Sequence, residues 1–282
     1  MAPCTRPPEL RMVLLGKTGV GKSASGNTIL GSKVFDSQPA ACSVSRQCEK
    51  GSVTVRGRRL CVIDTPGFFD TQLPKDEFNL EIAKCISLCA PGPHAFLLVM
   101  PVGRYTEHER ETVREIQEMF SEDAWKYTIV LFTRGDELGG ESIEEFVRQN
   151  PHLQELVDKC GGRCQAFSNE NTGNRAQVRE LLGKIDSMLE ARGGGGGCCY
   201  TNEMYREAEA AITRETERRV REAGGDTQGG GEDPAERSGD EAEGERGSPA
   251  AGKAGDGEVE GEEGDGGGEE ETGASQRGAG AG

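Results

Sequence analysis

A glycine-rich octapeptide constrains the fold of this chain more than any other feature. The pattern G-x₄-G-K-[ST] is formed by Gly16, Lys17, Thr18, Gly19, Val20, Gly21, Lys22 and Ser23. Residues 10–15 (LRMVLL) before it have the composition of a buried strand, and residues 22–30 after it have the composition of a helix. Glycines let the backbone curl so that its N–H groups point at an anion, and the helix dipole adds positive potential. Strand, loop and helix together predict a P-loop that binds phosphates.

The side chains of this motif have predictable roles. Lys22 is expected to reach the β- and γ-phosphate oxygens, and the Ser23 hydroxyl to ligate Mg²⁺. Ala24 follows Ser23 in the first turn of the predicted helix. A chance match is the alternative in a chain with 42 glycines. The strand before the motif and the helix after it argue against chance.

A second motif, Asp64-Thr65-Pro66-Gly67, ends the apolar segment 60–64 (LCVID). Asp64 is suited to hold Mg²⁺ through water, and the Gly67 N–H to meet the γ-phosphate. The pattern D-x-x-G alone often marks only a turn. Its place at a strand end, downstream of a P-loop, favours the functional interpretation.

A third motif, Thr133-Arg134-Gly135-Asp136, follows the buried strand 127–132 (YTIVLF). Guanine presents N1–H and an exocyclic NH₂ as adjacent donors, and one carboxylate accepts both. Asp136 is placed for that role, and Asn169, after the last strand, would supply another base contact. The alternative is that Asp136 belongs to a surface turn and contacts no base. The motifs predict GTP or GDP with Mg²⁺ as ligands, and an ATPase remains an alternative that depends on Asp136.

Buried apolar strands alternate with helical segments along the first two thirds of the chain. This alternation predicts an α/β fold, a P-loop NTPase G domain with a mainly parallel sheet and helices on both faces. The expected organisation is a flexible N-terminus at 1–9, the G domain at 10–192, a glycine linker with an accessory amphipathic helix at 193–223, and a disordered acidic tail at 224–282.

Composition restricts the partners and the compartment. Residues 224–282 hold 17 acidic and four basic residues, so most of the net charge of −16 lies in the tail. This acidity argues against a nucleic-acid-binding surface. Without an apolar signal segment or an 18-residue apolar run, we expect a cytoplasmic protein without a transmembrane segment.

The ten cysteines are expected to be reduced thiols. Cys85 with Cys89, and Cys160 with Cys164, form C-x₃-C pairs. Core cysteines explain these pairs better than a zinc site, because the C-x₃-C spacing is looser than that of the usual zinc knuckle. Acylation of the adjacent Cys198 and Cys199 is an open route to peripheral membrane association.

With these motifs in order, the chain resembles the GIMAP family of immunity-associated, septin-related GTPases. The resemblance rests on LGKTGVGKSASGNTILG (15–31) and on GPHAFLLVMPVGRYTEHERETVREIQEMFSEDAWKYTIVLFTRGDEL (92–138). It implies GTP binding at 16–24, with Ser37 near the nucleotide and Ser45 where the family carries a Mg²⁺-ligating threonine. It also implies homodimerisation across the nucleotide face, with Arg104 as an arginine finger that reaches the partner's phosphates.

Hydrolysis is the open part of the prediction. Phe68 and Phe69 follow Gly67, where Ras-like enzymes place a water-orienting glutamine. We therefore expect slow intrinsic hydrolysis that dimerisation stimulates through Arg104. Arg104 could instead cap the turn at residues 102–103, or pair with Glu107 or Glu109. A GTP-loaded oligomeric scaffold that does not hydrolyse GTP is the alternative function.

Overall fold

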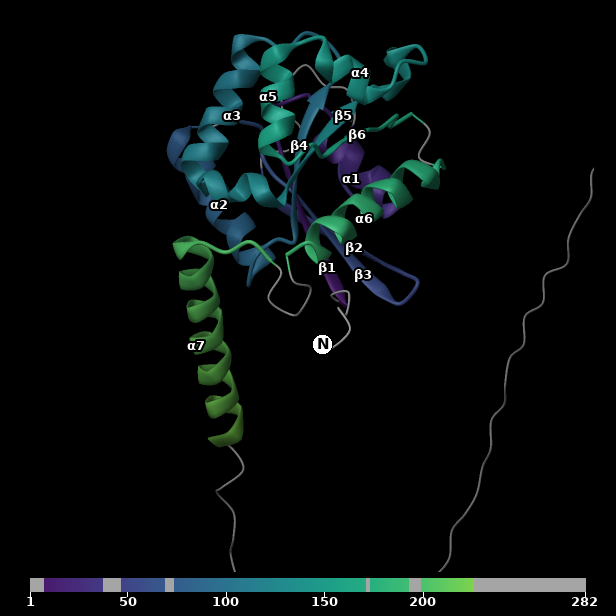
Figure 1. Ribbon diagram of the computed structural model, residues 1–282. Helices are drawn as coiled ribbons and strands as arrows, with labels where there is room; N and C mark the ends of the chain where they lie inside the picture. The colour runs from purple at the N-terminus through teal and green to yellow at the C-terminus, as the bar shows by residue number, and fades with distance from the viewer. Residues whose placement is uncertain (1–7, 38–46, 69–73, 171–172, 193–198, 226–282) are drawn as a thin grey trace, which may run out of the picture. The chain divides into compact units, whose positions relative to one another are not determined.

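A computed structural model describes residues 8–37, 47–68, 74–170, 173–192 and 199–225. Its centre is a six-stranded sheet in the order β2-β3-β1-β4-β5-β6 (Figure 1). The strands are β1 (Glu9–Leu15), β2 (Glu49–Val55), β3 (Arg58–Asp64), β4 (Ala95–Pro101), β5 (Thr128–Thr133) and β6 (Cys164–Ala166). β2 pairs antiparallel with β3, and the other neighbouring strands pair parallel. The predicted mainly parallel α/β sheet is confirmed.

The α-helices are α1 (Lys22–Leu30), α2 (Lys75–Cys89), α3 (Glu107–Phe120), α4 (Ile143–Arg148), α5 (Pro151–Lys159), α6 (Arg175–Glu190) and α7 (Glu203–Gly225), with 3₁₀ turns η1 (Glu122–Tyr127) and η2 (Gly135–Leu138). α3 begins at a capping box, in which the Thr106 and Glu109 side chains each bond the other's backbone. α4 ends before Pro151, and Pro151 begins α5, because the first helical position needs no N–H donor and Asn150 caps that end.

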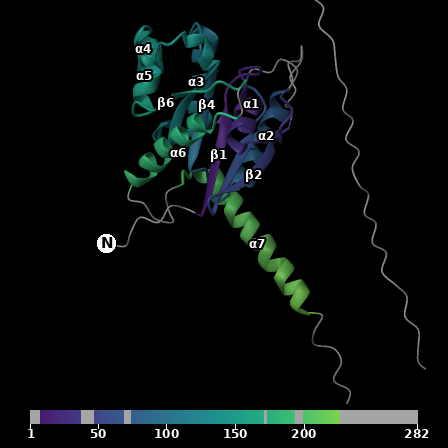
Figure 2. The ribbon, with the colours of Figure 1, turned by 90° about the vertical axis from the view of Figure 1, so that its right-hand side faces the viewer.

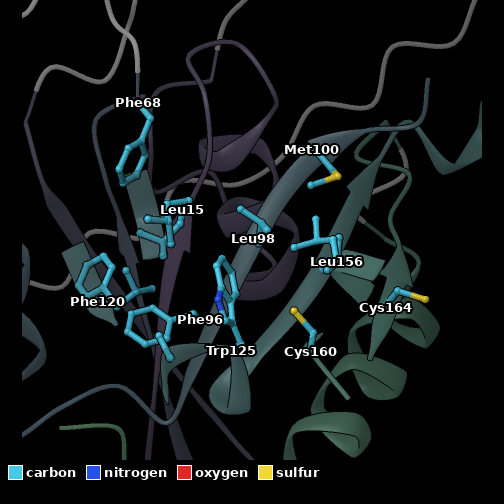
Figure 3. Close-up of a cluster of buried hydrophobic side chains, with 14 of the residues drawn as sticks. Leu15, Phe68, Phe96, Leu98, Met100, Phe120, Trp125, Leu156, Cys160 and Cys164 are labelled. Atoms are coloured by element: carbon cyan, nitrogen blue, oxygen red, sulfur yellow. The ribbon is translucent and has the colours of Figure 1, made fainter. Parts of the chain in front are cut away.

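The central strands β1, β4 and β5 are apolar on both faces because helices cover both faces. One core cluster joins alternate strand residues such as Leu14, Leu97 and Leu131 to α1 and α6. The other joins the intervening residues to α2, α3, α4 and α5 (Figure 3). Figure 2 shows the sheet and its helices from a second direction. Because successive side chains of a strand point to opposite faces of the sheet, each central strand contributes alternate residues to each cluster.

The segment before α7 is anchored in the second core cluster. Tyr200 and Tyr205 are almost fully buried there, and the Tyr200 hydroxyl donates to the Phe120 carbonyl. The Tyr200 N–H donates to the Pro93 carbonyl at 2.8 Å, just before β4 begins. Farther along α7, Ile212 is 44% exposed. The accessory helix therefore docks through its first turns, where Met204 and Ala208 of its apolar face pack against the same cluster beside the two tyrosines.

Two expectations about sites elsewhere can be compared with the structure. Cys85, Cys89, Cys160 and Cys164 are buried, and in the described ranges no cluster of histidines, cysteines or carboxylates is arranged to hold a metal ion. Within the same ranges, no helix has both the length and the apolar character to cross a membrane. Residues 226–282 of the predicted tail, Cys198 and Ser45 lie outside the described residues, and Gly224 and Gly225 of that tail belong to α7.

Candidate nucleotide-binding site

The P-loop turns tightly between β1 and α1. Gly16, Gly19 and Gly21 have φ values of 144°, 80° and 93°, which strongly favour glycine. A Cβ on Gly16 would lie 2.4 Å from the Val99 carbonyl oxygen, so the loop passes directly over β4. The Lys22 ammonium is folded over this loop and donates to the carbonyls of Gly16 at 3.1 Å and Lys17 at 2.8 Å. A positive charge thus stands at the centre of the loop.

The first turn of α1 faces this loop without a side-chain cap. Gly21 is the N-cap, and the turn contains no acidic residue. The N–H groups at a helix start have no partner inside the helix, and they favour an anion. Lys22, Ser23 and Ala24 therefore occupy the positions at which the helix start of a P-loop binds phosphates.

The two predicted magnesium ligands from separate elements lie together. The Ser23 hydroxyl donates to the Asp64 carboxylate at 2.5 Å. Asp64 ends β3 beside Leu14 of β1, and it is 2% exposed. A hydroxyl and a carboxylate are the hard oxygen donors that Mg²⁺ prefers. The residues present therefore fit this ion.

The D-x-x-G segment packs against the P-loop backbone. A Cβ on Gly67 would lie 2.0 Å from the Thr18 hydroxyl and 2.4 Å from its nitrogen, so only glycine fits. The Phe68 N–H donates to the Gly16 carbonyl at 3.1 Å. The Phe68 ring is buried and meets Phe78 of α2 edge to face, with centroids 5.0 Å apart. Phe68 therefore serves the core and offers no polar group for orienting water.

The third motif is tied to both the P-loop and the last strand. The Thr133 hydroxyl donates to the Val20 carbonyl at 2.8 Å. The Gly135 N–H donates to the Phe167 carbonyl at 2.8 Å. Thr133 is 3% exposed, so its side chain supports the loop from below.

Asn169 is tied to α1 through both ends of its amide. Its oxygen accepts from Thr28 at 2.8 Å, and its nitrogen donates to Ser25 at 3.0 Å. The neighbouring Ser168 exchanges two 3.0 Å hydrogen bonds with the Gln177 amide. The loop after β6 is thus held against the helix that follows the P-loop.

These loops meet around one open pocket with a cavity volume of about 320 Å³. It is lined by Gly19, Val20, Gly21, Ala24, Thr133, Arg134, Asp136, Glu137, Asn169 and Glu170. Asp136 is exposed at this pocket, and Arg134 forms an ion pair with Glu137 at 3.7 Å. Segments more than 100 residues apart in sequence thus line one pocket. Glu137 and Glu170 were missed from the sequence, because no motif includes them.

Arg104 lies exposed in the turn between β4 and α3. Its proposed intramolecular partners are engaged elsewhere: Glu107 pairs with Arg110 at 2.6 Å and with Arg114 at 3.1 Å. Glu109 bonds Thr106 and pairs with Lys17 of the P-loop at 3.3 Å. Burial opposes ionisation of Glu109, but the Thr106 hydrogen bonds and the Lys17 charge lower its pKa. Within the described part of the chain, Arg104 forms no ion pair with either glutamate.

Ser37 is the last described residue of the segment that follows α1. The Asn27 amide nitrogen donates to its hydroxyl at 3.3 Å and to the Phe35 carbonyl at 2.8 Å. The Asn27 oxygen accepts from the N–H groups of Val34 and Phe35, each at 2.8 Å. Asn27 therefore shapes this loop, a role that no motif signals. The predicted contact between Ser37 and the nucleotide stays a prediction.

Comparison with known proteins places this site in a family. The AIG1 family model matches residues 10–219. GTPase IMAP family member 8 of Homo sapiens is 39% identical over 189 residues, which cover 66% of this chain and 28% of that protein. Immune-associated nucleotide-binding protein 9 of Arabidopsis thaliana is 37% identical over 208 residues, which cover 71% of this chain and 60% of that protein. The chain thus matches between 28% and 60% of the length of these relatives.

Solved structures agree on the fold. Toc33 from Arabidopsis thaliana in complex with GDP and Mg²⁺ superposes with a TM-score of 0.50 at 19% identity, over 64% of this chain and 84% of that one. A second Toc structure superposes with a TM-score of 0.51 at 19% identity, over 64% of this chain and 83% of that one. That structure is described as showing that dimerisation is important for the GTPase activity of the chloroplast translocon components atToc33 and psToc159. At this identity the likeness shows a GTPase-type G-domain fold. Because the family model covers the P-loop, both later motifs and most of α7, this chain belongs to the AIG1 family, the GIMAP or immune-associated nucleotide-binding proteins.

Proposed function

We propose that residues 10–192 bind GTP or GDP with Mg²⁺ and act as a nucleotide-dependent switch. The observation that carries the proposal is the single pocket where the P-loop meets Asp136 and Asn169. A guanine nucleotide has phosphates at one end and a base with two adjacent donors at the other. The pocket offers a phosphate-binding loop and a carboxylate at matching places.

Each part of the nucleotide has a candidate partner. Lys22 would exchange two backbone carbonyls for phosphate oxygens, which accept a charged hydrogen bond more strongly. Ser23 and Asp64 would hold Mg²⁺, which neutralises phosphate charge when bound. Gly67 would offer its N–H to the γ-phosphate. We propose Ser37 and Ser45 as further contacts of the nucleotide and the ion.

Base choice is the part most readily tested. Wild type should bind a fluorescent GTP analogue that unlabelled GTP displaces and ATP does not. Asp136→Ala should weaken GTP binding by at least about tenfold, the scale of one charged hydrogen-bonded contact. Glu137→Ala, which changes the adjacent carboxylate of the same pocket, should retain the preference for guanine. If Asp136→Ala left that preference intact, the base assignment would be wrong.

Hydrolysis is proposed to depend on a second copy of the chain. The buried Phe68 leaves intrinsic turnover without a polar side chain that orients water from this position. The exposed Arg104 could stabilise the charge that develops on a partner's phosphates. The reported link between dimerisation and GTPase activity in atToc33 and psToc159 supports this arrangement.

Phosphate release at rising protein concentration tests this proposal. Activity per molecule should rise with concentration in wild type, and Arg104→Ala should abolish the rise. Arg148→Ala, at an exposed arginine on α4, serves as the matched control and should behave as wild type. A rate per molecule that does not change with concentration would contradict dimer-dependent catalysis.

The alternative function is a GTP-loaded scaffold that oligomerises without turnover. The observation in its favour is again Phe68, which fills the water-orienting position with a buried ring. GTP that stays intact at every protein concentration, in a protein that binds it tightly, would establish this alternative over the GTPase.

A further inference from the structure

Two free cysteines lie where the start of β2 meets α2, and Glu49, the residue after Cys48, pairs with Asp64 of the proposed nucleotide site. Cys48 lies directly before β2, and Cys85 lies in α2. The Cys48 N–H donates to the Glu81 carboxylate at 2.7 Å, and the Lys50 ammonium donates to the Leu88 carbonyl at 3.0 Å. Glu81, Cys85 and Leu88 are spaced at i, i+4 and i+7, so they share one face of α2. Two hydrogen bonds therefore hold the start of β2 against α2 on either side of Cys85.

The Cys48 and Cys85 thiols lie between these two hydrogen bonds. Cys85 is fully buried in the second core cluster, and Cys48 is partly exposed and packs against the same cluster. A hydrogen bond with Cys48, followed by burial, raises the pKa of the Cys85 thiol well above its usual value. One thiol is thus reachable from solvent, and the second lies in contact with it behind the surface.

We propose that Cys48 and Cys85 are a dithiol that a peroxide converts into a reversible disulfide. The Cys48 thiolate attacks a peroxide oxygen, so that an S–O bond forms and the O–O bond breaks. With hydrogen peroxide this step gives a sulfenic acid and hydroxide, which becomes water by taking up the proton that the Cys48 thiol released. The Cys85 sulfur then attacks the Cys48 sulfur, the S–S bond forms, and the S–O bond breaks. The hydroxide that leaves takes up the Cys85 proton, so two thiols and one peroxide give one disulfide and two waters.

This disulfide would link two parts of the proposed nucleotide site. Cys48 follows residues 38–46, which include Ser45, and Cys85 lies in the helix after Asp64-Thr65-Pro66-Gly67. A covalent bond between them closes a loop that contains β2, β3 and the second motif. We expect slower nucleotide release from the oxidised chain, a consequence that rests on the proposed function. Formation of the disulfide itself does not depend on nucleotide binding.

Peptide mapping of the full chain tests the proposal. The reduced protein is treated with hydrogen peroxide, its remaining thiols are alkylated, and it is digested without reductant. A Cys48–Cys85 crosslink should dominate, should disappear after dithiothreitol, and should be absent in Cys48→Ser. Cys61→Ser changes a buried thiol in β3 that hydrogen-bonds Glu9, and this control should keep the crosslink.

Because folding brings Cys48 and Cys85 together, oxidation of the unfolded chain gives a second test. Oxidation in guanidinium should reduce the Cys48–Cys85 crosslink to a minor product among the pairings of ten cysteines. Two outcomes would overturn the proposal: sulfinic acid at Cys48 with Cys85 still alkylated, or a Cys85–Cys89 crosslink as the main product. A crosslink with unchanged nucleotide release would refute only the functional consequence. Absence of nucleotide binding in the reduced chain would instead refute the proposed function.

Discussion

At the scale of residues, the site depends on close backbone contacts as much as on charged side chains. Gly67 and Gly16 allow three backbone segments to meet where any side chain would collide. Thr133 then fixes the P-loop from below through the Val20 carbonyl. These contacts set the shape into which phosphates must fit. Small substitutions at Gly67 and Thr133 should therefore affect nucleotide binding.

Gly67→Ala should disrupt the phosphate loop. Its new methyl group would need the space of the Thr18 backbone nitrogen, 2.4 Å away, so the loop has to shift. Overpacking of this kind costs roughly 1–3 kcal/mol, and the shifted loop should lose most GTP affinity. Gly183→Ala is the control, because its methyl group meets no atom within 4 Å in α6 and should stabilise the helix by about 1 kcal/mol. Titration with fluorescent GTP and urea unfolding measure both effects. Wild-type affinity in Gly67→Ala would refute the steric argument.

Thr133→Val should lower the free energy of unfolding by about 1–3 kcal/mol, because it keeps the shape and leaves the Val20 carbonyl without its donor. Thr133→Ser retains the hydroxyl and should cost less. Urea unfolding of the three proteins without nucleotide checks the order. Equal stability of the valine and serine variants would show that the hydrogen bond contributes little.

At the scale of elements, two tyrosines attach α7 to the G domain in chemically different ways. The Tyr200 hydroxyl donates to the Phe120 carbonyl, and its ring packs against Phe96 and Tyr127. The Tyr205 hydroxyl is buried and has no hydrogen-bond partner among the described residues. The same chemical change at the two positions should therefore have different results.

Tyr200→Phe should destabilise the protein by about 1 kcal/mol, through loss of a buried hydrogen bond. Tyr205→Phe should be neutral or stabilising, because it removes a buried hydroxyl that has lost its water without gaining a partner. Thermal unfolding of both variants beside wild type measures the contrast. A larger loss at Tyr205 than at Tyr200 would contradict this description of the docking.

Local chemistry explains which elements the sequence predicts well. The apolar runs at 10–15, 95–100 and 127–132 mark central strands, and each observed strand differs from its run by one or two residues at its ends. The glycines around α1 set its bounds, and Lys22–Leu30 was predicted to the residue. The strand order and the 3₁₀ turns depend on contacts between distant segments, which periodicity does not report. For the same reason, Tyr200 and Tyr205 gave no signal in a short, polar segment.

The residues of the candidate site also fall into two groups, those that the sequence identifies and those that only the fold brings to the site. The motif residues that meet at the pocket were identified from their sequence, because phosphate and base recognition restrict the residue types at fixed spacings. Asn27, Glu109 and Glu137 were not assigned to the site, since their roles arise only from folding. The hydrogen bond of the Thr133 hydroxyl to the P-loop likewise arises only from folding.

At the scale of the whole molecule, one buried histidine should link stability to pH. The His94 side chain is buried, with 6% of the residue exposed, and its Nδ1 accepts the Arg11 backbone N–H at 3.0 Å. The backbone N–H of His94 donates to the Arg11 carbonyl at 2.8 Å. Burial, and then the charges of Arg11 and Arg58, lower the pKa of His94 to about 3. The folded protein therefore keeps His94 neutral at a pH where the unfolded chain protonates it.

The sign of the effect follows from this difference in proton binding. Below the ordinary histidine pKa of about 6.5 the unfolded chain binds the extra proton, so stability falls as pH drops from about 6.5 towards 3, by up to about 1.4 kcal/mol per pH unit. His94→Asn keeps an acceptor for Arg11 but does not titrate. Urea unfolding between pH 4 and 7 should give a shallower pH dependence for this variant. Identical slopes would show that His94 does not contribute.

The central claim is that this pocket recognises guanine through Asp136. Asp136→Asn tests it most directly, because an amide offers one acceptor and one donor in place of two acceptors. Xanthine carries a carbonyl where guanine carries its amino group, so it matches the amide and not the carboxylate. Competition binding should show that wild type prefers GTP over xanthosine triphosphate and that Asp136→Asn reverses this order, with Glu137→Gln unchanged from wild type. If Asp136→Asn kept the preference for GTP, another group would recognise the base and the account would be contradicted.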